Sequence, residues 1–522
     1  MPSTTIDPDS CYRAVTSRDP RFDGMFFTAV RTTGIYCRPV CPARTPKRSS
    51  CTFFQTAASA EHAGYRPCLR CRPELAPGRV DFETSLAEAI LSHLQARSLE
   101  SRDAETFAAE IGLSSRQVRR ILLDRFGVTP IEVVQTQRLL FARKLLRETD
   151  LSMTQLAFAS GFRSLRRFNA AFRDQYGQTP SQLRRESLED REGGGDGVAS
   201  DADIVLRLSY RPPYDWDTLC RYLAGRGTAG VEAVVVDGAS STYRRTVSLA
   251  HGDEVVHGWL SVTRDTRSRL RSAATAHALT VTLSNTLLPV LMPTTQRLRE
   301  LFDLDADPAR IATHLRADPL LTDEVDASPG LRMPGAWEPF ELALRAVLGQ
   351  QISVAGASTL SGRIAARFGD VVVTPFPALD RSAPTASALA RADVADIAAI
   401  GMPRSRAKTV RELACFAADG GLTMPPGTSA DDAVARLDAV PGIGPWTAQY
   451  IAMRALRYPD AFPAGDLGLR KAAGLLAGTD APTERQLDAR AEQWRPWRAY
   501  AAATLWHSLV RRASASTKGK EL

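Results

Sequence analysis

The sequence predicts a multidomain α+β chain in which helices dominate, and three observations support this prediction. Six of the eight cysteines lie within residues 1–80, which indicates a small cysteine-bearing domain. Residues 83–187 read as helices that contain a repeat with a period of about fifty residues. Residues 203–290 hold β-like runs that predict an antiparallel sheet, and residues 291–512 are mostly helical. The length of 522 residues allows three or four such domains.

Composition points to a globular chain with a weak preference for nucleic acid. The formal net charge is +8, and only six of the 66 cationic side chains are lysines. Guanidinium groups pair bidentately with phosphate, so an arginine excess suits a nucleic-acid partner. The chain has no run of eighteen apolar residues, and its first ten residues, MPSTTIDPDS, lack the pattern of a signal peptide. We therefore expect a cytoplasmic protein.

Four of the cysteines form two close pairs. The pattern is Cys37-x3-Cys41, then 26 residues, then Cys68-x2-Cys71. In a reducing compartment such clusters indicate metal ligands before disulfides, and four thiolates favour one tetrahedral zinc ion. A redox dithiol or a chance pairing is the alternative. Two further cysteines of this region fit no pairing and are expected to be buried or incidental: Cys11 and Cys51.

The segments around these pairs are TTGIYCRPVCPARTP, residues 32–46, and GYRPCLRCRPE, residues 64–74. They resemble the N-terminal domain of the Ada DNA-repair family over about seventy residues. The resemblance implies that Cys37 accepts methyl groups from methylphosphotriesters in DNA while all four cysteines bind zinc. It also implies that three residues contact the DNA backbone: Thr33, Arg44 and Arg66.

The chemistry of a methylphosphotriester explains why a metal-bound cysteine is suited to this role. The neutral triester is a weak electrophile, so the attacking sulfur has to be a thiolate, and a metal-bound thiol is deprotonated. Methylation turns one thiolate into a neutral thioether. The cluster then repels the neighbouring phosphates less, and we expect DNA binding to tighten irreversibly.

The helical repeat consists of RFGVTPIEVVQTQRL from residue 125 and QYGQTPSQLRRESL from residue 175. A helix–turn–helix pattern precedes each copy, with Gly112 or Gly161 at the turn and Ser114 or Ser164 as the N-cap of the second helix. The pair resembles the DNA-binding domain of AraC-type regulators, which implies promoter DNA and RNA polymerase as partners and a nucleoid location. The arginines expected to meet DNA are Arg116, Arg119, Arg120, Arg163, Arg166 and Arg167.

A glycine-rich acidic stretch, residues 188–202, predicts a flexible linker, and residues 513–522 predict a disordered tail. Between them, residues 203–512 resemble the AlkA family of alkylbase DNA glycosylases. Three segments carry the resemblance: SYRPPYDWDTL, EPFELALRAVLGQQISVAGA and LDAVPGIGPWTAQYIAMRAL. The chain has no Pro-Cys-His-Arg motif, so we expect no methyl transfer from O6-methylguanine.

The last of these segments predicts a helix–hairpin–helix element. Gly442 and Gly444 allow the backbone to approach a phosphate at the start of a helix. In the family this element also holds a cation through backbone carbonyls. Asp466, twenty residues past Trp446, is expected to stabilise the oxocarbenium-like state of glycosidic cleavage, or to N-cap the helix that follows it, or both. Because Trp446 stands where strand-nicking relatives have lysine, the enzyme is predicted to be monofunctional.

An aromatic pocket for the positively charged alkylated base completes the prediction. By resemblance its walls are Trp446, Tyr450 and Trp506, whose π faces attract a cation. The base has to leave the DNA stack, and Gln351 is our prediction for the side chain that fills the gap.

The main hypothesis is therefore a bifunctional protein of the alkylation-damage response. It combines methyl transfer to Cys37, which switches on transcriptional activation, with excision of bases such as 3-methyladenine and 7-methylguanine. Two alternatives remain open at this stage. One is a transcription regulator whose glycosylase-like half is only a scaffold, and the other is a glycosylase whose zinc module is inert and only targets DNA.

Overall fold

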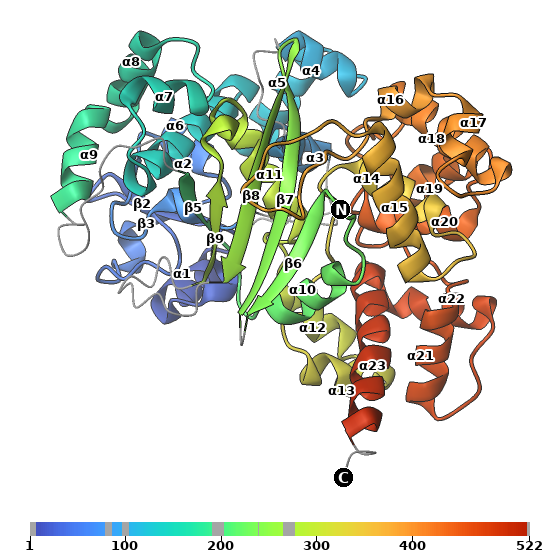
Figure 1. Ribbon diagram of the computed structural model, residues 1–522. Helices are drawn as coiled ribbons and strands as arrows, with labels where there is room; N and C mark the ends of the chain where they lie inside the picture. Colours follow the sequence, from blue (N-terminus) through green and yellow to red (C-terminus); the bar gives the residue numbers. More distant parts are fainter. Residues whose placement is uncertain are drawn as a thin grey trace. The chain divides into compact units, whose positions relative to one another are not determined.

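The computed structural model describes residues 7–78, 86–96, 104–189, 203–237, 240–264 and 277–518 (Figure 1). The chain divides into two compact units, each made of several segments. The first unit comprises Met1–Pro212, Val247–Gln296 and Pro425–Gly427; the second comprises Pro213–Thr246, Arg297–Met424 and Thr428–Leu522. Among the helices of the described residues, none combines the length and the apolar character needed to cross a membrane.

The cysteine-bearing domain is a small sheet with short helices around it. The strands are β1 (Phe27–Val30), β2 (Ile35–Cys37), β3 (Cys51–Phe54) and β4 (Arg66–Pro67), and their order is β3-β1-β2-β4. The helices are α1 (Pro8–Ser17) and α2 (Ala57–His62), with 3-10 turns η1 (Pro20–Phe22), η2 (Arg48–Ser50) and η3 (Pro73–Leu75). The sequence patterns did not predict this sheet, because its strands are only two to four residues long.

The parallel pairing of β2 with β4 is what brings the two cysteine pairs together. Tyr36 lies opposite Pro67, and the backbone N–H of Cys68 donates to the carbonyl oxygen of Tyr36 at 2.9 Å. Cys37 therefore ends one strand beside the place where Cys68 leaves the next.

Two helix–turn–helix motifs follow, as the repeat predicted. The helices are α3 (Leu86–Ala96), α4 (Ala104–Glu110), α5 (Ser115–Phe126), α6 (Pro130–Glu148), α7 (Met153–Ala159), α8 (Leu165–Tyr176) and α9 (Pro180–Glu189). Ser114 caps α5 and Ser164 caps α8, while Gly112 and Gly161 have φ angles of 70° and 79°. These predictions are confirmed. The predicted linker begins within α9, and its residues 190–202 lie outside the described residues.

Helix α6 joins the two motifs and packs on the cysteine-bearing domain. Glu61 of α2 is buried between them, where it accepts hydrogen bonds from the hydroxyls of Tyr36 at 2.9 Å and Thr136 at 2.8 Å. Burial raises the pKa of Glu61 to about 7, against the lowering effect of these hydrogen bonds and of Arg143. The pKa of this buried carboxyl is thus brought close to neutral pH.

The predicted antiparallel sheet is present and has five strands. They are β5 (Ile204–Ser209), β6 (Glu232–Asp237), β7 (Ser240–His251), β8 (Glu254–Arg264) and β9 (Ala278–Leu283), in the order β5-β9-β8-β7-β6. Alternate residues of β9, among them Val281 and Leu283, are fully buried, as a half-buried strand requires. Helix α10 (Trp216–Ala224) buries the side chains of Trp216 and Cys220. Strand β5 lies at one edge of this sheet.

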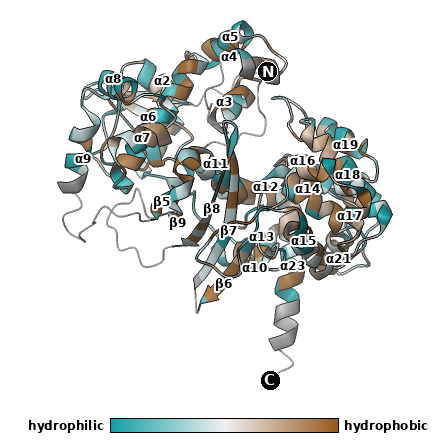
Figure 2. Cartoon of the chain, turned by 45° about the horizontal axis from the view of Figure 1, so that its top comes forward, coloured by the Kyte–Doolittle hydropathy of each residue, from teal (hydrophilic) through white to brown (hydrophobic). Residues whose placement is uncertain are grey.

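The remainder is helical, as predicted. The helices are α11 (Leu291–Leu301), α12 (Pro308–Leu315), α13 (Pro319–Ala327), α14 (Pro339–Leu348), α15 (Val354–Phe368), α16 (Ala386–Arg391), α17 (Val394–Ala398), α18 (Arg404–Ala418), α19 (Ala430–Asp438), α20 (Pro445–Arg454), α21 (Leu467–Ala477), α22 (Glu484–Ala491) and α23 (Arg498–Lys518), with 3-10 turns η5 (Asn285–Val290) and η6 (Glu492–Trp494). Helix α14, largely hydrophobic in Figure 2, contacts α15, α18 and α20. Since α23 continues to Lys518, the prediction of a disordered tail from residue 513 is wrong for residues 513–518.

The raised pKa of Glu61 predicts a pH-dependent stability. A carboxyl whose folded pKa exceeds its unfolded value stabilises the fold fully below the unfolded pKa, and this contribution is lost as the pH rises through the folded value. Between a pKa of 4.5 and about 7 the loss amounts to about 3 kcal/mol. The Glu61→Gln variant does not titrate, so its melting temperature at pH 8 should exceed that of the wild type. This difference in melting temperature should be several degrees larger at pH 8 than at pH 4.5. Calorimetry of the full chain measures this, and an equal difference at both pH values would contradict it.

Candidate functional site

The four paired cysteines converge in the folded chain. Their sulfur atoms all lie within 4.8 Å of one another, and the Sγ atoms of Cys41 and Cys68 are 4.0 Å apart. None of the four forms a disulfide. A zinc ion with four sulfur ligands at about 2.3 Å places the sulfurs about 3.8 Å apart. The donor set and its spacing therefore fit a tetrahedral metal site.

The members of this cluster differ in exposure. Cys68 and Cys71 are buried, whereas Cys37 and Cys41 are partly exposed. A thiolate that reacts with a macromolecule has to be reachable from outside, while one that only holds a metal does not. The geometry thus leaves the first pair as the accessible one.

A buried arginine, which the sequence analysis did not single out, supports the cluster. The backbone N–H of Arg38 donates to Cys71 Sγ at 3.3 Å, and its Nη1 donates to the Cys71 carbonyl at 3.0 Å. Its guanidinium also pairs with buried Asp23. Burial lowers the pKa of Arg38, but Asp23 outweighs it and the pKa ends above its usual value. The only sequence signal was an arginine directly after Cys37.

The residues predicted to meet DNA from this domain lie at its surface. Thr33 and Arg44 are exposed, and Gly34 beside Thr33 takes a φ of 66° in the turn between β1 and β2. Arg66 is also exposed, and its Nη1 lies 3.5 Å from the carbonyl oxygen of Tyr176 at the end of α8. Arg66 thus connects this domain to the second helix–turn–helix.

The six predicted arginines of the helix–turn–helix pair all have exposed side chains. Those of the first motif lie on α5, opposite buried Val118 and Leu122. Those of the second lie on α8 or just before it, opposite buried Phe168 and Phe172. Each motif therefore presents an arginine-bearing face that the fold does not cover: Arg116, Arg119 and Arg120, and Arg163, Arg166 and Arg167.

The predicted helix–hairpin–helix is formed by α19, α20 and the turn between them. Gly442 has a φ of 87°, and a Cβ there would lie 2.0 Å from Thr409 Oγ1, so no other residue fits. Gly444 is the N-cap of α20 and is followed by Pro445, which leaves the first amides of the helix without side-chain caps. Gln350 donates to the Gly442 carbonyl at 3.0 Å and so ties this turn to the end of α14.

Gln351, the predicted gap-filling residue, lies in the turn between α14 and α15. It is exposed and has a φ of 57°, a backbone conformation that side-chain-bearing residues seldom adopt. Such strain persists where the surroundings impose it and is common at functional turns.

Asp466 is held by three N–H donors. Trp446 Nε1 donates to its Oδ2 at 3.0 Å, and Trp506 Nε1 donates to its Oδ1 at 3.0 Å. The backbone N–H of Leu469 also donates to Oδ1, at 2.9 Å, so Asp466 is the N-cap of α21. The carboxylate is partly exposed. Its role as the N-cap of α21 therefore leaves it accessible for the predicted stabilisation of a positive charge.

The three predicted aromatic residues form one group around this carboxylate. The rings of Trp446 and Tyr450 stack with centroids 5.4 Å apart and an interplanar angle of 14°. Trp506 meets Tyr450 edge-on, with centroids 6.3 Å apart. The rings come from α20 and α23, and all three are partly exposed. They provide π surface beside a negative charge.

Two further members of this group were missed by sequence reasoning. Arg454, buried at the end of α20, donates to the hydroxyl of Tyr450 at 2.9 Å and to that of Tyr222 at 2.7 Å. Burial raises the pKa of Tyr450, but Arg454, Arg226 and Arg345 outweigh it, so this pKa lies below its usual value. Tyr222 lies on α10, more than two hundred residues before Tyr450, and no local pattern signals such a contact.

A four-thiol cluster beside tandem helix–turn–helix motifs, and a carboxylate framed by aromatic rings beside a helix–hairpin–helix, define a multidomain DNA-repair protein. Four family models match in this order: the metal binding domain of Ada, residues 10–74; a helix-turn-helix domain, residues 107–186; the AlkA N-terminal domain, residues 205–338; and the HhH-GPD superfamily of base excision DNA repair proteins, residues 344–496.

The chain is 39% identical over 506 residues to the probable bifunctional transcriptional activator/DNA repair enzyme AlkA of Mycobacterium tuberculosis, covering 96% of this chain and 97% of that protein. It is 33% identical to DNA-3-methyladenine glycosylase 2 of Escherichia coli over 58% of this chain and 97% of that one. It is 32% identical to the bifunctional activator/repair enzyme Ada of Escherichia coli over 35% of this chain and 50% of that one. The chain belongs to the family of bifunctional transcriptional activator/DNA repair enzymes of the AlkA type. The match to the Ada metal-binding domain and the four clustered thiols together support zinc.

The thiol cluster predicts one tightly bound zinc ion per chain. Elemental analysis of the purified full chain should give about one zinc, and cobalt substitution should give the absorption of a tetrahedral thiolate site. Cys71→Ser removes a buried ligand and should lower the metal content to well below one. Cys220→Ser, which changes a buried cysteine outside the cluster, is the control and should leave the metal content unchanged. A wild-type chain without stoichiometric metal would contradict the prediction.

Proposed function

We propose that this chain takes up methyl groups from DNA methylphosphotriesters on Cys37, activates transcription in response, and excises alkylated bases such as 3-methyladenine and 7-methylguanine. The observation that carries the excision half is Asp466, held by two tryptophan N–H groups inside an aromatic group. The observation that carries the methyl-acceptor half is a partly exposed thiol in a four-thiol cluster. The activity of relatives named as activator and repair enzymes supports the same combination.

In the methyl-acceptor half, Cys37 sulfur attacks the methyl carbon of the triester. An S–CH3 bond forms, the CH3–O bond breaks, and its electron pair stays on the phosphate oxygen, which becomes an ordinary diester anion. Cys37, Cys41, Cys68 and Cys71 would hold a zinc ion, which would keep their thiols deprotonated at neutral pH. Arg38 holds the Cys71 loop in place, while exposed Thr33, Arg44 and Arg66 are positioned to bind the DNA backbone.

Methyl uptake acts as a switch because it removes one negative charge beside the DNA. The loss of repulsion tightens binding of the tandem helix–turn–helix motifs to promoter DNA, where the arginines of α5 and α8 meet bases and phosphates. Contact with RNA polymerase and a nucleoid location belong to this proposal, since relatives are named transcriptional activators.

In the excision half, the alkylated base leaves the DNA stack and lies against Trp446, Tyr450 and Trp506. Its positive charge favours the π faces, and it makes the base a good leaving group. When the glycosidic bond breaks, its electrons go to the base, and Asp466 stabilises the positive charge that develops on the sugar. A water oxygen then bonds to the anomeric carbon, and its proton is released. No amine replaces Trp446, so the strand is not nicked.

DNA is held for this step by the turn around Gly442 and Gly444, whose helix amides favour a phosphate. A cation bound by backbone carbonyls of the same element would add to this attraction. Gln351, exposed at its strained turn, is proposed to fill the space that the extruded base leaves.

The proposed organisation assigns residues 1–80 to methyl uptake and residues 83–187 to DNA binding, with residues 188–202 as a linker. Residues 203–290 form the β domain and residues 291–512 the glycosylase domain. Every proposed functional residue lies within the domain that carries its task, which supports this assignment.

Methyl uptake predicts a modified peptide. Incubation of the full chain with DNA that carries labelled methylphosphotriesters should transfer about one methyl group per chain, and peptide mapping by mass spectrometry should place it on Cys37. Cys37→Ser should take up none. The Cys51→Ser control retains all four cluster thiols and should behave as the wild type. Absence of label in the wild type, or a label on another cysteine, would remove this half of the proposal.

Excision predicts a large rate loss in Asp466→Asn. Asparagine also caps helices, so its Oδ1 can keep the Trp506 and Leu469 N–H donors, while the charge and the acceptor for Trp446 Nε1 are lost. Single-turnover release of 3-methyladenine should fall about 100-fold or more. Asp307→Asn is the matched control, since Asp307 caps α12 in the same way, accepting from the Arg310 N–H at 3.1 Å, and lies outside the aromatic group. Base release by Asp466→Asn at the wild-type rate would refute the assignment.

A further inference from the structure

The edge strand of the five-stranded sheet is bound by side chains of the helix–turn–helix pair. Strand β5 pairs with β9 on one side only, so the backbone groups of its other edge need partners. Glu148 of α6 accepts from the backbone N–H of Arg207 at 3.0 Å, and Lys144 Nζ donates to the Arg207 carbonyl. Lys144 and Glu148 also pair with each other at 2.7 Å, one helical turn apart. Together they satisfy both backbone groups of one residue of the edge.

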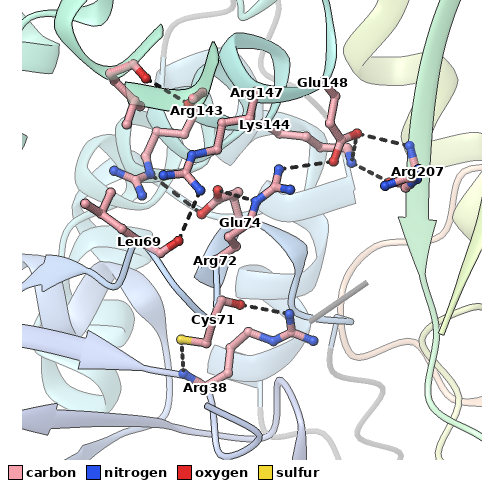
Figure 3. A network of polar contacts seen from close by, with 12 residues as sticks. Arg38, Leu69, Cys71, Arg72, Glu74, Arg143, Lys144, Arg147, Glu148 and Arg207 are labelled. Carbon is pink, nitrogen blue, oxygen red and sulfur yellow. Dashed lines mark hydrogen bonds and ion pairs between the residues drawn. The ribbon is translucent and has the colours of Figure 1, made fainter. Parts of the chain in front are cut away.

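The same glutamate is bound from the metal-binding loop. Arg72, directly after Cys71, donates through Nη2 to Glu148 Oε1 at 3.2 Å and through Nε to Glu74 at 3.3 Å. Figure 3 shows these residues as one continuous set of polar contacts between the loop, α6 and β5. The side chain of Lys144 is 7% exposed, that of Glu148 8% and that of Arg72 15%, so water screens these charges little.

Helix α6 also holds this loop at two other points. The side chain of Glu74 is fully buried and forms an ion pair with Arg143 of α6. The distance between Arg143 Nε and Glu74 Oε2 is 3.6 Å. Arg147 donates to the carbonyl oxygen of Leu69, between Cys68 and Cys71, at 3.0 Å. Movement of the loop that carries the second cysteine pair therefore disturbs several buried charges of α6.

A second route leads from the metal cluster to the end of β5. Arg211, two residues after β5, is almost fully buried, and its Nε donates to the carbonyl oxygen of Asp23 at 2.9 Å. The carboxylate of Asp23 binds Arg38, which in turn holds Cys71 through its backbone N–H and its Nη1. Arg211 also donates to the carbonyl of Gly78. One route reaches Arg207 within β5 and the other reaches Arg211 just after it, and both lead to the segment at Cys71.

The division of the chain into compact units is consistent with these contacts. Strands β5, β8 and β9 belong to the same compact unit as the cysteine-bearing domain and the helix–turn–helix pair. Helix α7 packs against η5, the segment that follows β9. The division between the units therefore does not follow the predicted linker.

We propose that these contacts form an internal docking interface through which metal binding by the four cysteines and attachment of strand β5 stabilise each other. The interface consists of Arg72, Lys144 and Glu148 on one route and of Asp23, Arg38 and Arg211 on the other. It connects the methyl-acceptor domain to the first strand of the glycosylase-type sheet. This inference rests on the metal site of the proposed function and extends it to the stability of strand β5.

Reciprocity makes the inference measurable without any repair assay. If zinc binding stabilises the docked strand, docking must stabilise zinc binding by the same free energy. We expect the weaker zinc binding of an undocked strand to appear as faster zinc release. Loss of a buried ion-pair partner leaves the other charge unpaired, so the docked state responds to single substitutions.

The first experiment uses the wild-type full chain with and without zinc. Hydrogen–deuterium exchange should be at least about fivefold faster in peptides covering residues 204–211 after a chelator removes the metal. Peptides covering α18, residues 404–418 of the other compact unit, serve as the internal control and should exchange at unchanged rates. Unchanged exchange of β5 in a chain that has lost its zinc would overturn the inference.

The second experiment measures zinc release to a chromophoric chelator from full-length variants. Glu148→Gln and Arg211→Lys change residues that touch no cysteine, and each should release zinc at least about fivefold faster than the wild type. Arg207→Ala is the matched control, because it keeps the backbone N–H and C=O that Glu148 and Lys144 bind. It should release zinc at the wild-type rate.

The outcomes separate this inference from the proposed function. A wild type that binds no zinc would remove both. Stoichiometric zinc with wild-type release rates in both variants would remove only the docking interface. Equal acceleration of zinc release by Arg207→Ala and Glu148→Gln would also overturn the docking interface. The contacts of Glu148 and Lys144 with the Arg207 backbone would then not be the cause of slow release.

Discussion

Buried charge on helix α6 organises the first compact unit. Arg143 and Lys144 are almost fully buried there, and a buried cation is tolerated only where anions neutralise it. Burial lowers the pKa of Lys144, and Glu148 counteracts this effect only in part. Burial raises the pKa of Glu74, but Arg143, Arg72 and Arg147 outweigh it and bring the pKa below its usual value. Since Arg72 and Glu74 directly follow the second cysteine pair, the helix that joins two DNA-binding motifs also positions half of a metal site.

The two candidate sites are assembled in different ways. The thiol cluster depends on a short parallel pairing between β2 and β4, which places Cys37 beside Cys68. The carboxylate site depends on helix packing, because Asp466 receives hydrogen bonds from side chains twenty and forty residues away. Each site pairs the group proposed to react with rigid supports: Arg38 for the cysteines, and two indole N–H groups for the aspartate. This is the arrangement that covalent uptake and electrostatic stabilisation require.

The proposed function deals with one kind of damage in two chemical ways. A methylated phosphate is uncharged and is removed by a nucleophile that is consumed, which makes the event a durable signal. A methylated purine is cationic and is removed by cleaving a bond that its own charge has weakened, which leaves the enzyme free to act again.

Local patterns in the sequence were sufficient for the four cysteines, the tandem motifs and the strands from residue 203 onward, whereas Asp466 and its aromatic neighbours were named from the resemblance to a known family. Spacing within a loop, helical periodicity and strand alternation are properties of neighbouring residues, so they survive without knowledge of the fold. Local patterns did not predict the roles of Arg38, Tyr222 and Arg454. They also did not predict that Lys144 and Glu148 bind the backbone of Arg207. Some of these residues are separated from their partners by more than two hundred residues in the sequence. A buried arginine or an edge strand acquires its partner only when the whole chain packs.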